Sequence, residues 1–219
     1  LSEYEALKSK KYVFNKNYFV VNNGININHK NNITKKQISN SLKLLSVGRV
    51  TAQKNLHLLI QALSIIKQKK IFSLNIIGPF TDIKYYKYCK KIIKENSLIN
   101  IRFLGSLSNI EIINLYKSYD LLCMPSIVEG YSMVILEAAS QGLPSILTKG
   151  HSNYEEIINS KSGILVQDNK YDIAEKILNF YSDKGLQKRM RINAYEYALN
   201  NYSIILKARQ LYNEYKDIL

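Results

Sequence analysis

Several features that identify common protein classes are missing from these 219 residues. No run of about 18 uncharged apolar residues occurs, which argues against a membrane-spanning helix, and the first residues lack the basic-then-apolar order of a signal peptide. Only two cysteines are present, Cys89 and Cys123, and they form no Cys-x-x-Cys pair. We therefore expect two reduced, buried thiols in a cytoplasmic protein, without a disulfide framework or a zinc site.

Glycine-rich nucleotide fingerprints are also absent. The chain contains neither Gly-x-Gly-x-x-Gly nor Gly-x-x-x-x-Gly-Lys-[Ser/Thr], so dinucleotide-binding and P-loop interpretations lose their main support. It has no zinc-finger pattern, no aromatic RNA-binding motif and no basic region followed by heptads. Specific nucleic-acid binding is therefore not expected.

Acidic residues are scarce relative to basic ones. The 17 Asp and Glu residues stand against 31 Lys and Arg, which gives a formal net charge of +14. Such an excess attracts anionic partners. The lysines are spread along the chain in pairs such as Lys69-Lys70 and Lys90-Lys91. This spread favours an ordinary solvated surface, and peripheral attachment to an anionic membrane surface is the second interpretation.

A regular alternation of strand and helix patterns begins at Leu42. Apolar residues at helical spacing run from Leu56 to Ile66, Ser108 and Glu111 form a capping-box pattern, and Gly142 stands where a helix should end. Short apolar strands separated by helices predict a Rossmann-like α/β fold, with a parallel sheet of about six strands and helices on both faces. Strands are predicted at 42–47, 72–77, 100–103, 121–124, 144–147 and 163–166, and helices at 55–67, 82–95, 109–117, 133–141, 155–159, 171–181, 185–200 and 204–218. Upstream, the patterns predict a helix at 2–11, a strand at 18–21 and a linker at 26–41.

Ligands of such a sheet bind where the strands end and run into helices. Gly48 permits a turn after the first regular strand, and Arg49 and Lys54 place two cations there, which suits a diphosphate. Gly78 follows the next strand and lets backbone approach a ligand. Taken alone, an Arg or a Lys at such a position is more often a solvated loop charge.

Two glutamates stand in the stretch of residues 125–144. In a continuous helix, Glu129 and Glu137 would lie about 12 Å apart, beyond the roughly 5–9.5 Å of paired glycosidase carboxylates. An acid/base pair is therefore disfavoured. The better interpretation puts Glu129 at the reacting end of an elongated ligand and Glu137 at its hydroxyl groups. The backbone N–H groups of Tyr131, Ser132 and Met133 then face a phosphate.

Together these motifs resemble a known family, the retaining GT-B glycosyltransferases of family 4, also called glycosyl transferases group 1. Their Glu-x7-Glu signature is matched by Glu129-Gly-Tyr-Ser-Met-Val-Ile-Leu-Glu137, and their Ser-Val-Gly-Arg…Lys element by residues 46–54. Weaker landmarks follow the family order: Asn23-Gly-Ile-Asn26, Phe103-Leu-Gly105, Glu156-Ile-Ile158, Gly163-Ile-Leu-Val166 and Tyr202-Ser203.

The resemblance implies transfer of a sugar from a UDP- or GDP-sugar to a glycan or lipid-linked acceptor, with retention of configuration. It implies no metal and no other cofactor, in agreement with the lack of an Asp-x-Asp motif. The catalytic candidates are Arg49 and Lys54 at the diphosphate and Glu129 at the donor sugar. The remaining donor-binding candidates are Glu137 at the ribose, Gly130, Tyr131, Ser132 and Met133 through their amides, Gly48 and Gly78 in the loops, and Arg102 and Leu107 near the base.

The resemblance also predicts the domain organisation. Family members carry an acceptor-binding domain before the Asn-Gly turn, so the chain alone is expected to be inactive or nearly so. The expected parts are a remnant of that N-terminal domain at 1–21, a linker at 22–41, the nucleotide-sugar-binding domain at 42–202, and a helix at 203–219 that packs back towards the N-terminal domain.

Four departures from the family pattern affect the choice of sugar: Asn55, Asn26, Ser132 and Ser152-Asn153. We expect His151 to be a solvated loop residue, with a donor contact as the alternative, and His29 and His57 to be structural or surface residues. Two other functions stay open, a nucleotide-sugar-binding module without catalysis and a GT-B-like nucleotide-sugar epimerase.

Overall fold

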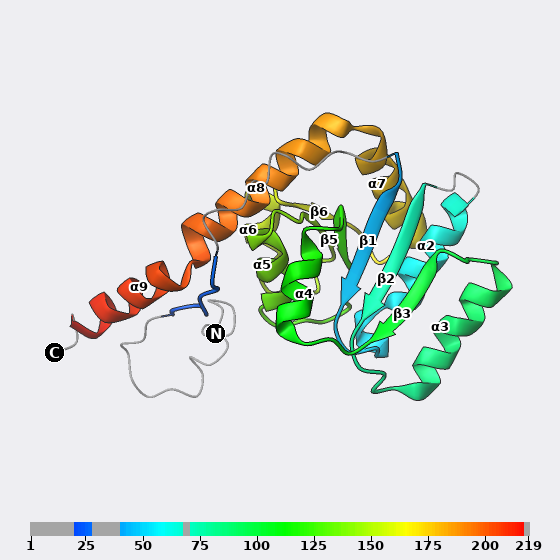
Figure 1. The fold of residues 1–219 in the computed structure, drawn as a ribbon, viewed down its shortest axis with the longest axis horizontal. Helices are drawn as coiled ribbons and strands as arrows, with labels where there is room; N and C mark the ends of the chain where they lie inside the picture. The colour runs from blue at the N-terminus through cyan, green and yellow to red at the C-terminus, as the bar shows by residue number, and fades with distance from the viewer. Residues whose placement is uncertain (1–19, 28–39, 68–70, 217–219) are drawn as a thin grey trace.

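The protein is described by a computed structural model that covers residues 20–27, 40–67 and 71–216. All six of its strands are parallel and form one sheet in the order β3-β2-β1-β4-β5-β6 (Figure 1). The predicted Rossmann-like sheet is thereby confirmed. The strands are β1 (Leu42–Val47), β2 (Phe72–Ile77), β3 (Ile101–Gly105), β4 (Leu121–Met124), β5 (Ser145–Leu147) and β6 (Gly163–Leu165).

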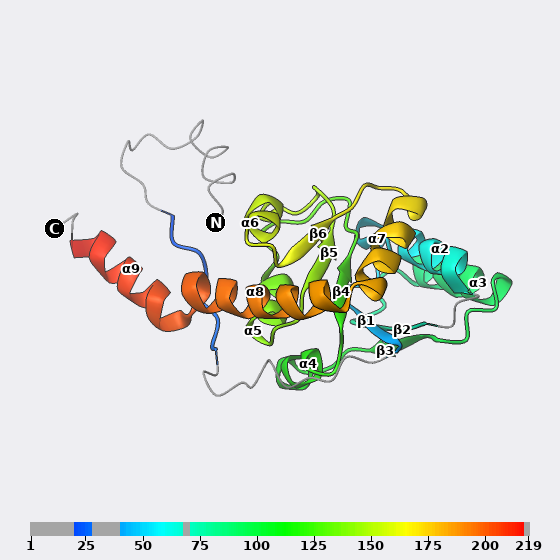
Figure 2. The same cartoon turned by 90° about the horizontal axis from the view of Figure 1, so that it is seen from above.

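Helices lie where the sequence predicts them, with ends that differ by one or two residues, except that the short η2 is not among the predicted helices and the end predicted at 218 lies outside the described residues. They are η2 (Ala52–Lys54), α2 (Leu56–Ile66), α3 (Ile83–Glu95), α4 (Asn109–Tyr116), α5 (Met133–Ser140), α6 (Tyr154–Asn159), α7 (Lys170–Ser182), α8 (Lys184–Tyr202) and α9 (Ile204–Lys216). Figure 2 shows α8 running beside α5 and continuing into α9, which projects away from the sheet.

Both faces of the sheet are buried, because successive side chains of β1 enter two different cores. Leu42 and Leu44 belong to the core that includes α2, α3 and α7. Leu45 and Val47 belong to the core that includes α4, α5, α6 and α8. A strand covered on both sides needs apolar residues at consecutive positions, which explains the adjacent Leu44 and Leu45.

Local chemistry sets the helix ends. Ser108 and Glu111 form the predicted capping box, in which each side chain satisfies the other residue's backbone N–H. The Asp82 side chain accepts from the Tyr85 N–H at 2.9 Å and begins α3. Gly142 adopts φ 67° just beyond α5, where glycine carries no Cβ penalty.

Residues 20–27 cross the protein beside the junction of α8 and α9. The Ile25 N–H donates to the Tyr202 carbonyl at 2.7 Å, and the Ile204 N–H donates to the Ile25 carbonyl at 2.9 Å. Gly24 lies so close that a Cβ there would stand 2.7 Å from Ile204 Cα. The early segment and the start of α9 therefore hold each other in place.

Some predictions fall partly outside the described residues. The helix at 2–11, His29 and most of the linker at 26–41 lie there, as do two residues of the strand predicted at 18–21; its other two residues, Val20 and Val21, are not in a strand. Cys89 and Cys123 are buried free thiols, as predicted. No helix in the described ranges combines the length and apolar character needed to cross a membrane.

Candidate functional site

Two glycine turns meet where β1 and β2 end. Gly48 and Gly78 have φ of 146° and 143°, a conformation that side chains rarely adopt. A Cβ on Gly78 would stand 2.0 Å from the Gly48 carbonyl oxygen, and one on Gly48 would stand 3.1 Å from Lys54 Cε. Glycine is therefore required for this close approach of backbone and lysine.

Lys54 and Glu129 form an ion pair across this edge of the sheet. Lys54 Nζ donates to Glu129 Oε2, and the two side chains are 16% and 26% exposed. The backbones are tied as well, because the Ile127 N–H donates to the Gln53 carbonyl at 2.9 Å. We call residues 125–132, between β4 and α5, the Glu129 loop. The pair holds η2 against this loop.

Arg49 stands beside the ion pair. It is exposed and lines a small hollow together with Gly48 and Lys54. The hollow continues to the end of β4 at Met124 and Ser126. The structure therefore brings the two predicted cations, Arg49 and Lys54, to one side of the Glu129 loop.

The N-terminus of α5 lies at the end of the same loop. Its N-cap residue, Ser132, makes no side-chain cap bond. Among the described residues, the backbone N–H groups of Tyr131, Ser132 and Met133 donate to no protein acceptor. Unpaired N–H groups at a helix N-terminus attract an anion, so this end suits a phosphate.

Glu137 lies one turn into α5, away from Glu129. Its side chain is half-buried beneath Tyr116, whose hydroxyl donates to Glu137 Oε2 at 3.5 Å. Burial raises the pKa of Glu137, and the Tyr116 hydrogen bond opposes that effect. The two glutamates have separate surroundings, as the spacing argument predicts.

The two predicted base-binding residues differ in their position relative to the carboxyl end of β3. Arg102 is the second residue of β3 and pairs with Asn75, whereas Gly105 ends the strand. About 10 Å of strand separates Arg102 from Gly105. Leu107 follows Gly105 and packs partly against the core of α4 and α5. The structure therefore places Leu107, but not Arg102, on the carboxyl side of β3.

The prediction for His151 is wrong, because its side chain is completely buried rather than solvated. Its Nε2 lies 2.9 Å from the Met124 carbonyl oxygen, and Nδ1 has no partner among the described residues. Gly150 explains the burial: a Cβ there would stand 2.4 Å from the Ile127 carbonyl oxygen, so the loop packs inward. Burial lowers the pKa of His151, which keeps the ring neutral.

Two further sequence expectations are resolved. Asn55 adopts the left-handed conformation, φ 55°, that asparagine tolerates better than most residues, and its Nδ2 donates to Asp168 Oδ1 at 2.6 Å. It therefore accommodates a position where the family pattern has glycine. His57 is partly buried against the Tyr85 hydroxyl, 3.0 Å from its Nδ1, as expected for a structural residue.

Sequence reasoning missed a cluster of tyrosines around Glu156. The hydroxyls of Tyr131, Tyr197 and Tyr202 all donate to Glu156 Oε2. Glu156 and Tyr202 belong to predicted landmarks, but the residues are 46 positions apart and no local spacing connects them. Only the packing of α8 beside α5 and α6 reveals the cluster.

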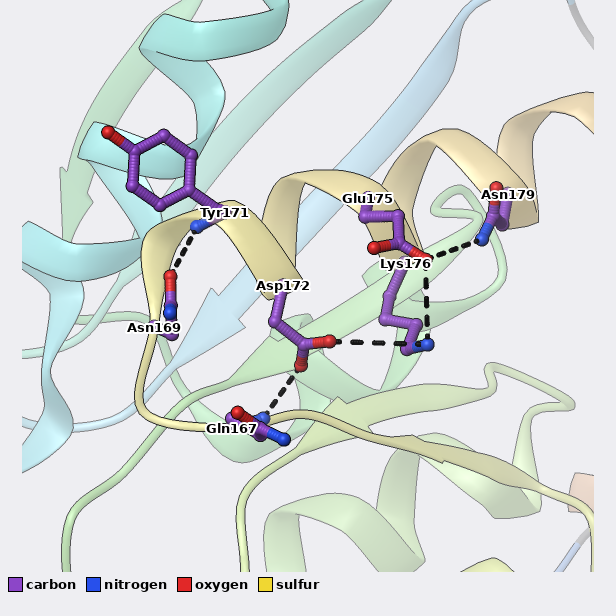
Figure 3. A network of polar contacts seen from close by, with 7 residues as sticks. All are labelled: Gln167, Asn169, Tyr171, Asp172, Glu175, Lys176 and Asn179. Atoms are coloured by element: carbon purple, nitrogen blue, oxygen red, sulfur yellow. Dashed lines mark hydrogen bonds and ion pairs between the residues drawn. The ribbon is translucent and has the colours of Figure 1, made fainter.

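A second cavity, of about 610 Å³, lies where β4, β5 and β6 end and α7 begins. Figure 3 shows two charged residues of its rim paired: Asp172 accepts from the Gln167 N–H at 2.8 Å and lies 4.0 Å from Lys176 Nζ. Asp168, also in the lining, accepts from Asn55. Both carboxylates of this cavity are thus held by protein groups, and the cavity shares Ser126 and Ile127 with the Glu129 loop, where the candidate site is placed.

The chain is similar to known proteins. A family model described as Glycosyl transferases group 1 matches residues 28–197. An uncharacterized glycosyltransferase of Methanocaldococcus jannaschii is 30% identical over 176 residues, 79% of this chain and 48% of that protein. The UDP-Gal:alpha-D-GlcNAc-diphosphoundecaprenol alpha-1,3-galactosyltransferase of Escherichia coli is 27% identical over 186 residues, 82% of this chain and 46% of that protein.

A solved structure is also similar. The crystal structure of a glycosyltransferase from Rickettsia africae matches with a TM-score of 0.80 and 26% identity, over 91% of this chain and 57% of that chain. The chain therefore spans about half the length of the curated relatives that it matches.

Proposed function

Because this chain belongs to the glycosyl transferases group 1, we propose that it forms the donor-binding half of a glycosyltransferase that uses a UDP- or GDP-sugar. One observation carries the proposal. Arg49, the Lys54–Glu129 pair and the uncapped N-terminus of α5 lie around one edge of the sheet. Cations and free N–H groups together suit a diphosphate.

Each group has a proposed task. Arg49, Lys54 and the N–H groups at the start of α5 stabilise the negative charge that develops on the departing diphosphate. Glu129 acts at the donor sugar, and Glu137 accepts hydrogen bonds from the ribose hydroxyls. This arrangement performs the role that a divalent ion has in other transferases, so we propose a metal-independent reaction.

The acceptor and the stereochemistry are further parts of the proposal. One relative is named as a galactosyltransferase that uses UDP-Gal and a diphosphoundecaprenol-linked sugar. By this likeness we propose a glycan or lipid-linked acceptor, transfer with retention of configuration, and membership of family 4. A lipid-linked acceptor would be met at a membrane, and the net charge of +14 is compatible with peripheral attachment to an anionic cytoplasmic surface.

The domain organisation remains a proposal too. α9 buries none of its side chains, and its exposed apolar residues are Ile204, Ile205, Leu206, Leu211, Tyr212 and Tyr215. Apolar side chains collected on one projecting helix suggest a partner surface. The match covers about half the length of the relatives. We propose that α9 packs against an N-terminal acceptor domain, and that residues 22–41 link this domain to the nucleotide-sugar-binding domain.

Calorimetric titration with UDP and with GDP tests the site. One of the nucleotides should bind, and Arg49→Ala or Glu137→Ala should weaken it at least tenfold, which is about 1.4 kcal/mol. Arg189→Ala is the matched control, because Arg189 is an exposed arginine on α8 that pairs with Asp183. Unchanged affinity in both site variants would mean that the site is placed wrongly.

A turnover assay tests whether transfer requires an N-terminal acceptor domain. Nucleotide release from a donor sugar should be negligible for these 219 residues, even with a lipid-linked acceptor present, and should appear when an N-terminal acceptor domain is supplied. Robust turnover by the chain alone would show that no second domain is needed.

A further inference from the structure

The side chains of three tyrosines, one from the Glu129 loop and two from α8, surround one carboxylate. Tyr131 belongs to the Glu129 loop, Glu156 to α6, and Tyr197 and Tyr202 to α8. The Tyr131 and Tyr197 hydroxyls each lie 3.0 Å from Glu156 Oε2, and the Tyr202 hydroxyl also donates to this oxygen. The Tyr131 and Tyr202 hydroxyl oxygens are also within hydrogen-bonding contact of each other, and because each hydroxyl has a single hydrogen, this bond alternates with their bonds to Glu156.

The same cluster contacts the segment of residues 20–27 and lies next to the junction of α8 and α9. Asn22 Nδ2 donates to the Tyr131 hydroxyl at 3.3 Å. Tyr202 accepts through its carbonyl oxygen from the Ile25 N–H and immediately precedes the junction with α9. The Tyr131 side chain is therefore anchored to α6, to α8 and to the segment of residues 20–27.

The tyrosines are packed so that their hydroxyls stay on Glu156. Tyr202 is 3% exposed, and its ring centroid lies 6.0 Å from that of Tyr131 and 5.4 Å from that of Tyr197. Burial raises the pKa of Tyr202 to about 12, so its hydroxyl remains a donor at neutral pH. Lys207 Nζ stands 5.0 Å from the centre of the Tyr202 ring and adds a positive charge beside the cluster.

A polar cluster of this kind fixes geometry more than it adds stability. Glu156 is exposed, so water competes for its oxygens and these hydrogen bonds add little stability, whereas together they favour one arrangement of the three rings. Tyr131 stands two residues after Glu129 and one before the N-cap Ser132. Fixing its side chain therefore fixes the peptide groups between the ion pair and α5.

We propose that Glu156 and Tyr202 are positioning residues that act through Tyr131 on the Glu129 loop. They hold the N–H groups of residues 131–133 in the orientation that a nucleotide diphosphate requires. This role rests on the proposed function, because it assumes that the diphosphate binds at the N-terminus of α5. Neither Glu156 nor Tyr202 needs to touch the ligand.

Single hydroxyl deletions in this chain, followed by calorimetric titration with UDP or GDP, whichever the unaltered chain binds, test the proposal. Tyr131→Phe should weaken the nucleotide about fivefold, the equivalent of one lost hydrogen bond. Tyr197→Phe is the matched control, because its hydroxyl bonds to the same carboxylate and to Tyr202 but makes no hydrogen bond to the Glu129 loop among the described residues. Its nucleotide affinity should change by less than about twofold, even where its thermal midpoint falls as far as that of Tyr131→Phe.

Substitution of the carboxylate adds a second comparison. Glu156→Ala should weaken the nucleotide about as much as Tyr131→Phe, and the double variant should be no weaker than either single variant, since both break one connection. Glu156→Gln keeps an oxygen acceptor and should retain most of the affinity. If Glu156→Ala does not fold, the comparison of Tyr131→Phe with Tyr197→Phe still decides.

The outcomes separate this role from the site itself. If Arg49→Ala weakens the nucleotide but Tyr131→Phe and Glu156→Ala leave it unchanged, the site stands and the positioning role is wrong. Equal weakening in Tyr131→Phe and Tyr197→Phe would show a general structural effect, which also overturns it. Failure of the unaltered chain to bind UDP or GDP would remove the proposed function, and the positioning role with it.

Discussion

Lys54 and Glu129 are 75 residues apart in the chain and form an ion pair. Lys54 ends η2, which follows β1, and Glu129 lies in the loop that follows β4. They meet because β1 and β4 are neighbours in the sheet. A diphosphate that approaches Lys54 must therefore share this cation with a carboxylate that already holds it.

This competition predicts an unusual effect of Glu129→Gln. Removal of the carboxylate charge frees Lys54 and takes away a nearby repulsion, so the affinity for UDP or GDP without a sugar should rise about three- to tenfold. Transferase turnover by the longer protein should fall, because Glu129 is proposed to act at the sugar. Lys54→Met is the counterpart and should weaken the nucleotide. A Glu129→Gln variant with weaker nucleotide binding would contradict this account of the pair.

The two glycine turns predict unequal costs for alanine. Gly78→Ala combines a strained φ with a Cβ only 2.0 Å from the Gly48 carbonyl oxygen, so it should lower the free energy of unfolding by more than about 2 kcal/mol. Gly105→Ala is the control, since its φ is 76° but nothing lies within 4 Å of the added Cβ. That variant should lose roughly 1 to 2 kcal/mol from strain alone. Urea unfolding measures both, and equal losses would show that close contact at Gly78 relaxes.

Buried His151 predicts a loss of stability in acid. Burial holds its pKa below the ordinary value of 6.5, so the unfolded chain takes up a proton that the folded chain resists. The destabilisation vanishes only well above pH 6.5 and grows as pH drops through and below that value. At pH 5.5 it reaches up to about 1.4 kcal/mol.

Comparison with a variant isolates this contribution from the carboxylates that titrate in the same range. Unfolding free energies of the unaltered chain and of His151→Gln should be measured at pH 7.5 and pH 5.5. The unaltered chain should lose more between the two pH values. Equal losses in both proteins would show that His151 accepts its proton in the folded state.

The two thiols should be unreactive in the folded protein. Cys89 and Cys123 are both fully buried, and burial raises the pKa of Cys89 to about 11 and that of Cys123 further. Little thiolate exists at neutral pH and little reagent reaches it. Ellman's reagent should therefore label neither thiol rapidly in buffer and both in urea. Rapid labelling in buffer would reveal local opening around α3 or β4.

The sequence by itself determined the fold class and most element positions. Consecutive apolar residues such as Leu44 and Leu45 predict a strand buried on both faces, and the spacing of Leu56 to Ile66 predicts a helix with one buried face. These signals are local, because burial period and capping chemistry depend on residues within a few positions. The capping box of Ser108 and Glu111 is predicted for the same reason.

The candidate site could be predicted only in part. Gly48, Arg49, Lys54 and Glu129 were identified because they follow predicted strands, where ligands of parallel sheets bind. Residue spacing also indicated that Glu129 and Glu137 are too far apart to act as an acid/base pair. It could not place Arg102, since the strand predicted at 100–103 ends two residues before the observed end of β3 at Gly105.

Only the tertiary structure decided which distant residues meet. Strand order brings Lys54 to Glu129, and the close packing of Gly150 against Ile127 buries His151 in a loop whose composition suggested solvent. Packing of α8 beside α5 and α6 brings Tyr202 to Glu156 and Tyr131. The physical reason is that an alternating pattern records which residues are buried, whereas the partner of a buried polar group depends on how the helices and strands are arranged in space.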